Sequence, residues 1–469
     1  MGFGKLRSWA LAFVCLAPCA CGGESTNALD KPSTCTPGQV SACACPGGTQ
    51  GTQTCVDDGT YEPCDCGGTG GTGGTGGTGG SGGTGGSSGT VGTGGTATGG
   101  TGTSGCANPP PNIDVDGDGW TAGEGDCDEC NPAVNPGAYD FPTNNLDDDC
   151  SGALDDPTIL CDDGLPESAP DDLTDAANAA KALGFCGTAS GVPGEPGPWG
   201  VFSAAYVFAD GSLASLPPDI LFGSCTGTGG ESAPPNPMSH GVLAAFGPSV
   251  NPIAGAALVA LSTGVARPGV LGDSPGGASM CTASATPPGF PKGAVAACPG
   301  LMIDTTPRAN DPIALELTIR PPTNANAFSF AFNFFSWEYP LYVCTEYADT
   351  FVALVNVPGM PPDNNAVITE LGDALSVNTT LISVCNPGQH GGMDFACPLG
   401  TGALSGTGFE DHGSTGWLRT TVPIDPGKSF TLRFAIWDAG DEVLDSTVLL
   451  DDFRWHEEDL PLETKPITP

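Results

Sequence analysis

Positively charged residues are scarce in this chain of 469 residues. It has 13 lysines and arginines against 53 aspartates and glutamates, which gives a formal net charge of −40. A nucleic-acid-binding domain needs a basic surface, and so does a protein that attaches to anionic lipid headgroups by charge. The composition therefore argues against both kinds of binding.

Long apolar runs and histidines are also rare. No run of 18 apolar residues follows the N-terminal segment, so the sequence predicts no transmembrane helix in the mature protein. The six methionines are scattered and do not indicate copper binding. The histidines lack the short spacings of catalytic zinc sites, such as H-E-x-x-H; the four are His240, His390, His412 and His456.

Glycine, proline and cysteine are abundant, with 73, 45 and 21 residues. Glycine and proline at this level disfavour helical bundles, and many cysteines are typical of a secreted protein in an oxidising compartment. Composition divides the chain into a signal peptide (1–20), a Cys-rich module (21–66), a Gly/Thr-rich linker (67–105), an acidic module (106–160), a large β domain (161–458) and a C-terminal tail (459–469).

The first 20 residues have the pattern of a signal peptide, with Lys5 and Arg7 ahead of a short apolar stretch. Ala20-Cys21 then matches the end of a bacterial lipoprotein signal, in which the cysteine takes the lipid. Pro18 departs from the aliphatic residue usual three positions before that cysteine. We expect a lipid on Cys21 that holds the protein at a membrane. The alternative is ordinary secretion, with Cys21 in a disulfide.

Two stretches unable to form a large core follow. Residues 67–105 repeat Gly and Thr without any charge, which predicts a flexible tether spanning about 35 Å root-mean-square. The stretch 35–66 is short and rich in cysteine, so disulfides are expected to hold it, with a metal cluster as the less favoured alternative. Its cysteines are Cys35, Cys43, Cys45, Cys55, Cys64 and Cys66.

A calcium-binding pattern begins the acidic module. Asp114, Asp116 and Asp118 stand at alternate positions, and Gly119 permits a sharp turn. Ca²⁺ takes about six to eight oxygen ligands, and alternate carboxylates converge when such a loop curls. Trp120 would add its backbone carbonyl. The sequence therefore predicts a calcium site.

This loop is not an EF-hand, because Gly125 stands where an EF-hand has its bidentate glutamate. Another carboxylate must complete the ligand shell, and the candidates are Glu124, Asp126 and Asp128.

A second, weaker copy of the pattern follows. Asp147, Asp149 and Ser151 occupy its alternate positions, so a hydroxyl replaces one carboxylate, and Asp155 and Asp156 come after them. Loops of this kind can hold Ca²⁺ purely to stabilise the fold, and a signalling role is not expected.

The stretch 114–156 resembles the repeated metal-binding motif of bacterial surface proteins. That motif starts D-x-D-G-D-G, continues with D-C-D-D and N-P-G-A, and ends D-N-D-C-D-G. This chain differs from it at Glu129, Asp148 and Ser151, and it lacks the cysteine that follows N-P-G-A. The resemblance implies ion binding over about 45 residues.

From residue 161 onward the apolar pattern has the period of β-strands. An Ala-rich helix is expected first, over 172–183, with Gly184 as its stop. Half-buried strands separated by Gly/Pro/Asn loops predict an all-β fold, an antiparallel, jelly-roll-like β-sandwich. The expected strands cover 313–319, 328–334, 351–357, 430–436 and 448–455.

A phenylalanine-rich strand is followed by S-W-E-Y, which contains Glu338, and by Y-A-D-T-F, which contains Asp349. This succession resembles the Choice-of-anchor L domain of bacterial surface proteins, over roughly 165–458. The closing D-D-F-R-W at 451–455 is similar to the last strand of that family. The resemblance implies a β-sandwich, various modes of attachment to the cell surface, and no established activity.

Two patterns resemble parts of catalytic sites. Glu338 and Asp349 could be the carboxylate pair of a glycoside hydrolase, which must lie about 5–9.5 Å apart. Alternatively, Glu338 pairs within the sheet or helps to bind a structural cation. The G-x-S-x-G pattern at 272–276 has Pro275 after its serine, and proline has no N–H for an oxyanion hole. No catalytic residue is therefore expected.

The cysteines after Cys21 fall into groups of six, four and eight, as separately oxidised modules require. Cys127 and Cys150 could tie the two acidic loops together, and Cys106–Cys130 would then be the second pair of that module. Proximity in the sequence suggests Cys161–Cys186 and Cys385–Cys397.

These features predict a non-catalytic lipoprotein of a Gram-negative-type envelope, in the outer membrane and exposed at the cell surface or in the periplasm. Its expected cofactor is Ca²⁺, and its membrane contact is the lipid on Cys21. The expected ligand is a carbohydrate or a surface protein, with no nucleic-acid partner. The alternative is a secreted surface glycoside hydrolase that uses a carboxylate pair in the β-sandwich.

Overall fold

The computed structural model describes residues 40–44, 50–54, 56, 109–157, 160–168, 175–212, 237–268, 282–441 and 443–467. The chain divides into two compact units, 1–98 and 99–469. In the first unit, strands β1 (Val40–Ala44) and β2 (Gln50–Thr54) form an antiparallel hairpin. The signal peptide, Cys21 and most of the linker lie outside the described residues, so the expectations about them stay predictions.

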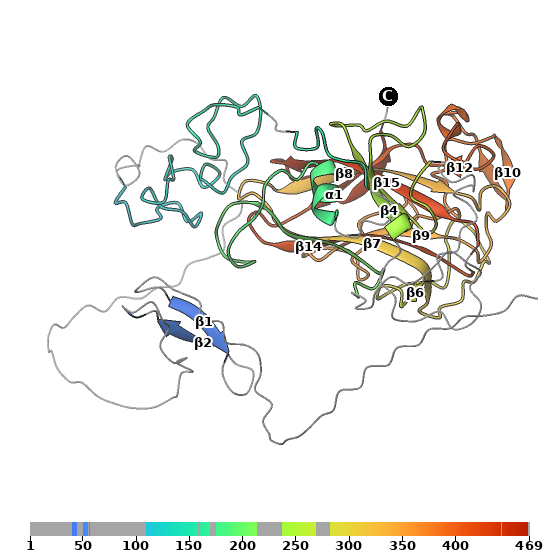
Figure 1. Cartoon of the computed structure of the whole chain (residues 1–469), viewed down its shortest axis with the longest axis horizontal. Coiled ribbons are helices and arrows are strands. Elements are labelled where there is room, and N and C mark those ends of the chain that lie inside the picture. The colour runs from blue at the N-terminus through green and yellow to red at the C-terminus, as the bar shows by residue number, and fades with distance from the viewer. Residues whose placement is uncertain are drawn as a thin grey trace, which may run out of the picture. The chain divides into compact units, whose positions relative to one another are not determined.

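The larger sheet of the second unit has seven strands, all antiparallel (Figure 1). Its order is β16-β13-β8-β15-β5-β4, and β12 also pairs with β8. The strands are β4 (His240–Leu243), β5 (Leu258–Ser262), β8 (Ala327–Ser336), β12 (Gly413–Ser414), β13 (Leu418–Pro423), β15 (Ser446–His456) and β16 (Glu463–Pro466).

The second sheet has five strands in the order β3-β7-β14-β9, with β6 paired to β7. They are β3 (Gly200–Val207), β6 (Ala283–Ser284), β7 (Ala309–Arg320), β9 (Thr350–Val355) and β14 (Phe430–Asp438). Smaller elements are the hairpin of β10 (Gly388–His390) and β11 (Met393–Phe395), the helix α1 (Ala176–Ala182) and the 3₁₀ turns η1 (Pro237–Ser239) and η2 (Gly402–Leu404).

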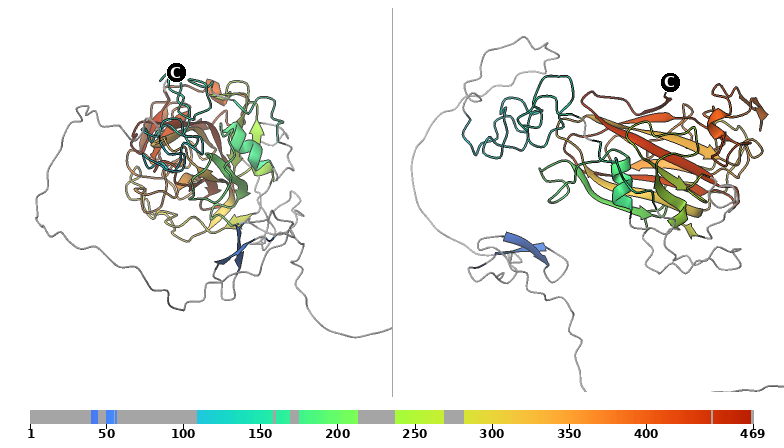
Figure 2. Two further views of the ribbon diagram at one scale, coloured as in Figure 1. Left: turned by 90° about the vertical axis from the view of Figure 1, so that its left-hand side faces the viewer. Right: turned by 45° about the horizontal axis from the view of Figure 1, so that its top comes forward.

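The two sheets lie face to face around one main core (Figure 2). Alternate phenylalanines of β8 point inward and meet those of β14: Phe328 stacks on Phe430 with ring centroids 5.3 Å apart, and Phe330 meets Phe434 edge-on at 4.9 Å. Alternation with period two places every second side chain on this face. The antiparallel β-sandwich expected from the sequence is confirmed.

Most of the strands expected from alternation are present with boundaries shifted by a few residues. The helix α1 is shorter than the pattern predicts, although residues 172–174 lie outside the described part, and Gly184 follows it with a φ of 108°. The expected C-terminal tail contains a strand instead, since β16 pairs with β13 and extends the larger sheet. Within the described residues, no helix has both the length and the apolar character to cross a membrane.

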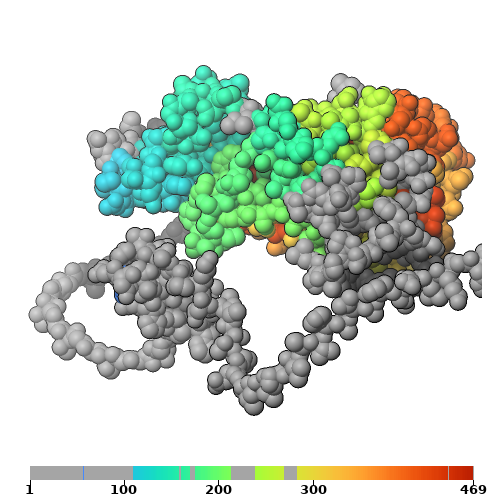
Figure 3. Space-filling view, in the orientation of Figure 1, coloured from blue at the N-terminus to red at the C-terminus, as the bar shows by residue number. Residues whose placement is uncertain are grey.

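The acidic module belongs to the same compact unit as the sandwich, and Figure 3 shows it packed beside the segment that leads into the sheets. Asn324 links the acidic module to the sandwich by hydrogen bonds. Its side chain accepts a hydrogen bond from the Tyr139 N–H and donates one to the Tyr139 carbonyl, both 2.9 Å long. The Thr323 N–H also donates to the Gly137 carbonyl at 3.0 Å. Among residues 109–157, turns and no regular elements form the backbone.

Candidate functional site

The first acidic loop curls around its own backbone amides. The Asp114 carboxylate accepts hydrogen bonds from the N–H groups of Gly117 and Gly119, at 2.6 and 3.1 Å. Asp118 accepts one from the Trp120 N–H at 2.7 Å. As a result, one carboxylate oxygen from each of Asp114, Asp116 and Asp118 lies within 4.8 Å of the others. The structure thus gathers the three alternate aspartates named from the sequence.

Burial and mutual repulsion act on these carboxylates. Burial raises the pKa of Asp118 to about 6, and the negative charges of Asp116, Asp126 and Asp114 add to the shift. The pKa of Asp126 is also raised, mainly by burial, and its Oδ2 is buried with no hydrogen-bond partner. A cation at this point would relieve both effects. Asp126 is therefore the best placed of the candidates for completing the shell.

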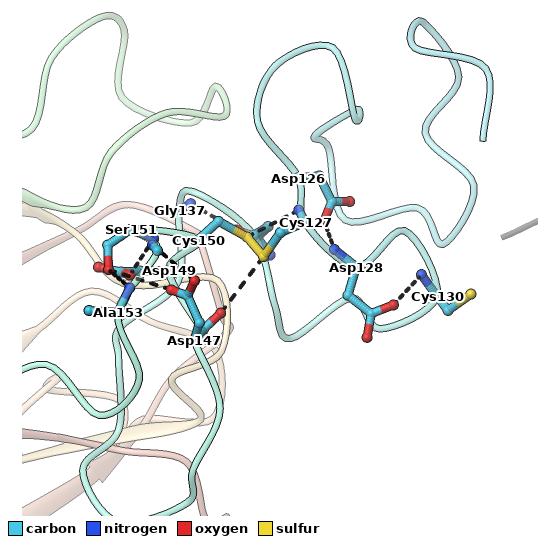
Figure 4. The surroundings of a disulfide bond; sticks show 12 residues. Asp126, Cys127, Asp128, Cys130, Gly137, Asp147, Asp149, Cys150, Ser151 and Ala153 are labelled. Carbon is cyan, nitrogen blue, oxygen red and sulfur yellow. Dashed lines mark hydrogen bonds between the residues drawn. A yellow bond between two sulfur atoms is a disulfide. The ribbon is translucent and has the colours of Figure 1, made fainter. Parts of the chain in front are cut away.

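The other two candidates make hydrogen bonds of their own. Glu124 accepts one from the Thr121 hydroxyl at 2.8 Å, and Asp128 accepts one from the Cys130 N–H at 3.3 Å (Figure 4). The sequence pattern missed the role of Glu129. This residue is buried and accepts hydrogen bonds from the N–H groups of Val115, at 2.9 Å, and Ala122, so that it closes the loop.

The second acidic site consists of different residues from those that the alternation predicts. Carboxylate oxygens of Asp140, Asp149 and Asp156 lie within 4.8 Å of one another. Asp140 is 7% exposed, its Oδ2 accepts a hydrogen bond from the Asp156 N–H at 2.6 Å, and its buried Oδ1 has no partner. Burial, followed by the nearby charges of Asp149 and Asp148, raises its pKa.

Three residues of the predicted second set serve instead as hydrogen-bond groups of the loop. Asp147 accepts from the Gly152 N–H at 2.9 Å, and Asp155 accepts from the Asn145 N–H at 3.0 Å. The Ser151 hydroxyl lies 3.5 Å from Asp147 Oδ1 and 3.3 Å from Asp156 Oδ2. Of the residues at the alternate positions, only Asp149 is in the observed cluster; Asp156, which follows the alternating pattern, is also in it. Asp140 was missed because it stands seven residues before the alternating pattern and comes close only through the fold.

A disulfide joins the two loops. Cys127 and Cys150 are bonded, with an S–S distance of 2.06 Å, and Figure 4 shows the loops on either side of this bond. Cys130 is disulfide-bonded as well. This disulfide links the two loops that carry the candidate metal sites, as the sequence suggested.

A cleft of about 920 Å³ lies between the acidic module, the end of α1 and the end of β15. Tyr139 and Trp199 stand edge to face in its wall, with ring centroids 5.5 Å apart. All three carboxylates of the second cluster also line it, so the second acidic site opens onto the cleft. Further lining residues include Phe141, Asn144, Lys181, Asp451, Arg454, Trp455 and His456.

Asp451 of β15 is a buried carboxyl in this wall. It accepts hydrogen bonds from the N–H groups of Ile253, Ala254 (3.2 Å) and Asp452 (2.6 Å). Burial outweighs these bonds and raises its pKa to about 7.

Comparison with known proteins concerns the sandwich. Residues 299–453 match the family model of the Choice-of-anchor L domain. This segment is similar to that domain. The match does not extend to the acidic module, and it covers less than the 165–458 expected from the sequence. No curated protein matches the chain.

One solved structure with a significant match is TmCBM61 in complex with β-1,4-galactotriose. The identity is 11%, the alignment covers 47% of this chain and 83% of that chain, and the TM-score is 0.19. At these values the likeness carries no conclusion about the ligand of this chain.

The Choice-of-anchor L segment contains the carboxylate pair Glu338 and Asp349. Both are 2% exposed, at the end of β8 and the start of β9. A sugar ring cannot reach carboxyl groups that lie inside the sandwich. Their burial therefore argues against the glycoside-hydrolase alternative. The G-x-S-x-G stretch at 272–276 lies outside the described residues.

Disulfides also hold the Choice-of-anchor L segment. Cys385 is bonded to Cys397 within it, and Cys161 is bonded to Cys186 just before the sandwich, as sequence proximity suggests. A further bond, between Cys298 and Cys344, joins residues 46 apart. Proximity could not indicate this pair, because only the fold brings the two chain segments together.

Proposed function

We propose that this protein is a non-catalytic cell-surface lipoprotein that binds an extracellular carbohydrate in the cleft between its calcium-loaded acidic module and its β-sandwich. The cleft carries this proposal, because its wall combines aromatic faces with a carboxylate cluster suited to a metal ion. Pockets for small ligands typically combine apolar and aromatic surface with a few fixed polar groups.

Calcium is the metal that the ligand chemistry favours. The gathered groups at both acidic sites are carboxylates, which are hard oxygen ligands, and Ca²⁺ tolerates the irregular geometry of flexible loops better than Mg²⁺ does. The buried oxygens Asp126 Oδ2 and Asp140 Oδ1 have no hydrogen-bond partner. A buried carboxylate oxygen without a partner is costly, and coordination to an ion removes that cost.

Carbohydrate is the ligand class that suits the cleft wall. The faces of Tyr139 and Trp199 offer surfaces on which sugar rings can stack, and Lys181, Arg454 and Asn144 offer hydrogen-bond donors. An ion held by Asp140, Asp149 and Asp156 would border the cleft. Ligand hydroxyls could then complete its coordination, so binding should depend on calcium.

The experiment is a glycan array probed with the secreted chain 22–469, in Ca²⁺ and in EDTA. We expect glycan binding in Ca²⁺ only, and its loss in Trp199→Ala and in Asp149→Ala. Matched controls are Glu195→Ala, an exposed carboxylate outside the cleft, and Tyr342→Ala, an aromatic residue outside it. Binding that survives EDTA and both cleft variants would contradict the proposal, and so would the absence of any glycan signal from a chain that still binds Ca²⁺.

Attachment through Cys21 is the second part of the proposal. Its support is the lipoprotein signal pattern, the uncharged linker that follows, and the similarity to a domain named for anchoring. Metabolic labelling with an alkyne fatty acid should label the wild type and not Cys21→Ala, which should appear in the medium. A label that persists in Cys21→Ala would show that the lipid is on another residue, and a wild type without label would show that Cys21 carries none.

A further inference from the structure

Four buried carboxyl groups gather at one end of the β-sandwich, away from the acidic module. Glu338 follows β8 and Asp445 precedes β15, both of the larger sheet. Asp349 precedes β9 and Asp438 ends β14, both of the smaller sheet. Their exposed fractions are between 0% and 2%. The cluster therefore lies between the two sheets, beside the loop 337–349.

These carboxyl groups repel one another. Burial raises the pKa of Asp438 well above its usual value, and Asp445 and Asp311 add to the shift. The pKa of Asp349 is raised in the same way, by burial and by the charges of Asp438 and Glu338. Among the described residues, the groups that most affect either carboxyl include no lysine or arginine. The protein thus places negative groups together without the cation that usually compensates for them.

Several oxygens of this cluster have no hydrogen-bond partner. Both carboxylate oxygens of Asp438 are buried and accept no hydrogen bond, and the same holds for Asp349 Oδ2. The Thr263 hydroxyl lies near Asp438 and lowers the pKa of that carboxyl, but it donates to the Ser446 carbonyl at 3.4 Å. Buried polar atoms are nearly always paired, so three unpaired carboxylate oxygens in one cluster favour a partner such as a cation.

Glu338 differs, because its Oε2 accepts hydrogen bonds from two serine hydroxyls. These belong to Ser336 of β8 and to Ser446 of β15, the latter at 3.1 Å. The Glu338 carboxyl also interacts with the side chain of Asp349. The serines hold Glu338 at a fixed place and orientation, which is how protein ligands of an ion are usually positioned.

We propose that Asp438, Asp349 and Glu338, with Asp445 beside them, bind a divalent metal ion that holds the two sheets together. The proposed ligands are all carboxylates, without nitrogen or sulfur, which favours Ca²⁺ over transition metals. By attracting groups that otherwise repel, the ion would draw the three carboxylates onto one centre. It would also fix the loop 337–349, which contains Glu338 near its start and ends at Asp349.

The competing explanation is that protons hold the cluster. Glu338 and Asp349 are adjacent, and a proton shared between them would also reduce the repulsion. The two explanations differ in what a neutral replacement does. Asp438→Asn removes a metal ligand but also removes a repelling charge. If a metal ion binds the cluster, Asp438→Asn should lose the stabilisation by that ion. If protons hold the cluster, Asp438→Asn should be more stable than the wild type with and without metal.

The test uses the secreted full-length chain with its acidic module disabled by Asp116→Asn and Asp149→Asn. Metal content is measured after gel filtration, and the thermal midpoint is measured in Ca²⁺ and in EDTA. We expect this background to retain about one Ca²⁺ per chain and to melt at a higher temperature in Ca²⁺. Adding Asp438→Asn should abolish both effects, while the matched control Asp451→Asn, a buried carboxyl bonded to backbone amides, should keep them.

Two outcomes would overturn the proposal. In the first, the chain with Asp116→Asn and Asp149→Asn holds no metal and has equal thermal midpoints in Ca²⁺ and EDTA. This result would exclude the site without any substitution in the cluster. The other is an Asp438→Asn chain that keeps its Ca²⁺, or that melts higher in both solutions, as the shared-proton explanation requires. Because glycan binding is not measured, the outcome is independent of the function proposed for the cleft.

Discussion

Asp451 is a single residue whose charge state should control part of the pH dependence of stability. Its pKa in the folded protein, about 7, lies above the usual 3.8 because the carboxyl is buried. The folded state therefore binds a proton that the unfolded state releases. The contribution of Asp451 to the free energy of unfolding is therefore largest at low pH and is lost as the pH rises from about 4 through 7.

The variant Asp451→Asn should remove this titration while keeping one acceptor for the backbone amides. We expect the free energy of unfolding of the wild type, relative to the variant, to fall by on the order of 2–3 kcal/mol between pH 5 and pH 8. Chemical denaturation of both chains at several pH values measures it. Parallel curves for the two chains would show that Asp451 stays ionised in the folded protein.

Asp148 has a structural role that the alternating pattern of the sequence does not indicate. Because it falls between the alternate positions, the pattern treats it as dispensable. In the structure it is 4% exposed, and its carboxylate accepts hydrogen bonds from the Phe141 N–H at 3.1 Å and from Asn144 Nδ2 at 2.7 Å. The pattern of a calcium loop identifies residues that converge locally, as with Asp114, Asp116 and Asp118. It is silent on carboxylates recruited by the fold, such as Asp140.

At the scale of elements, β16 is the clearest difference from the sequence-based expectation. Its four residues pair with β13, and the hydroxyls of Thr464 and Thr420 lie 2.8 Å apart. Deleting 459–467 should uncover the edge of β13 and lower the thermal midpoint by several degrees, since each kcal/mol corresponds to about 2–4 °C in a domain of a few hundred residues. Differential scanning calorimetry of the truncated and intact chains provides the measurement.

The control for this truncation is a chain with Glu463→Ala and Lys465→Ala, which removes the exposed ion pair of β16 but keeps the strand. Exposed pairs contribute little, so its midpoint should stay close to that of the wild type. If the truncated chain melts at the same temperature as the intact one, β16 contributes nothing to the sheet.

Strand prediction succeeded where phenylalanines and other large apolar residues alternate with smaller or polar ones, as in β8 and β14. It missed β13, although alternate residues of that strand are buried. It missed β4 and β5, which are four and five residues long and buried throughout. A short strand covered on both faces has no alternating pattern, and its apolar run cannot be told from a buried turn or helix. The sequence paired Glu338 with Asp349 and offered a structural cation as one role for Glu338. It did not join Asp438 to them, because the cluster assembles from the ends of strands in two sheets.

At the scale of the whole molecule, the acidic module and the sandwich form one unit, so ion binding by the module should affect the unit as a whole. The net charge of −40 makes the apo protein sensitive to charge screening. Two effects of added salt must therefore be separated. Screening shortens the range of repulsion, to a Debye length of about 10 Å at 0.1 M, and any salt produces it. Coordination requires a specific ion.

The last prediction separates these effects by the thermal midpoint of the secreted chain. Affinity is expected in the range of extracellular calcium sites, with Kd on the order of 10⁻⁴–10⁻³ M. Ten millimolar Ca²⁺ then exceeds Kd by about ten- to a hundredfold, and the upper value stabilises each site by about 2.7 kcal/mol. NaCl of equal ionic strength should raise the midpoint much less. Mg²⁺ should lie near NaCl, because it sheds its water reluctantly and demands octahedral geometry.

The same measurement on Asp116→Ala identifies the site responsible. That variant should lose part of the Ca²⁺ effect and keep the whole NaCl effect, because one carboxylate fewer hardly changes the total charge but removes a ligand from the first loop. Equal shifts with Ca²⁺, Mg²⁺ and NaCl, unchanged in the variant, would mean that these aspartates form only a solvated acidic surface. An ion-specific shift that Asp116→Ala reduces would instead show that the acidic loops need calcium to reach their full stability.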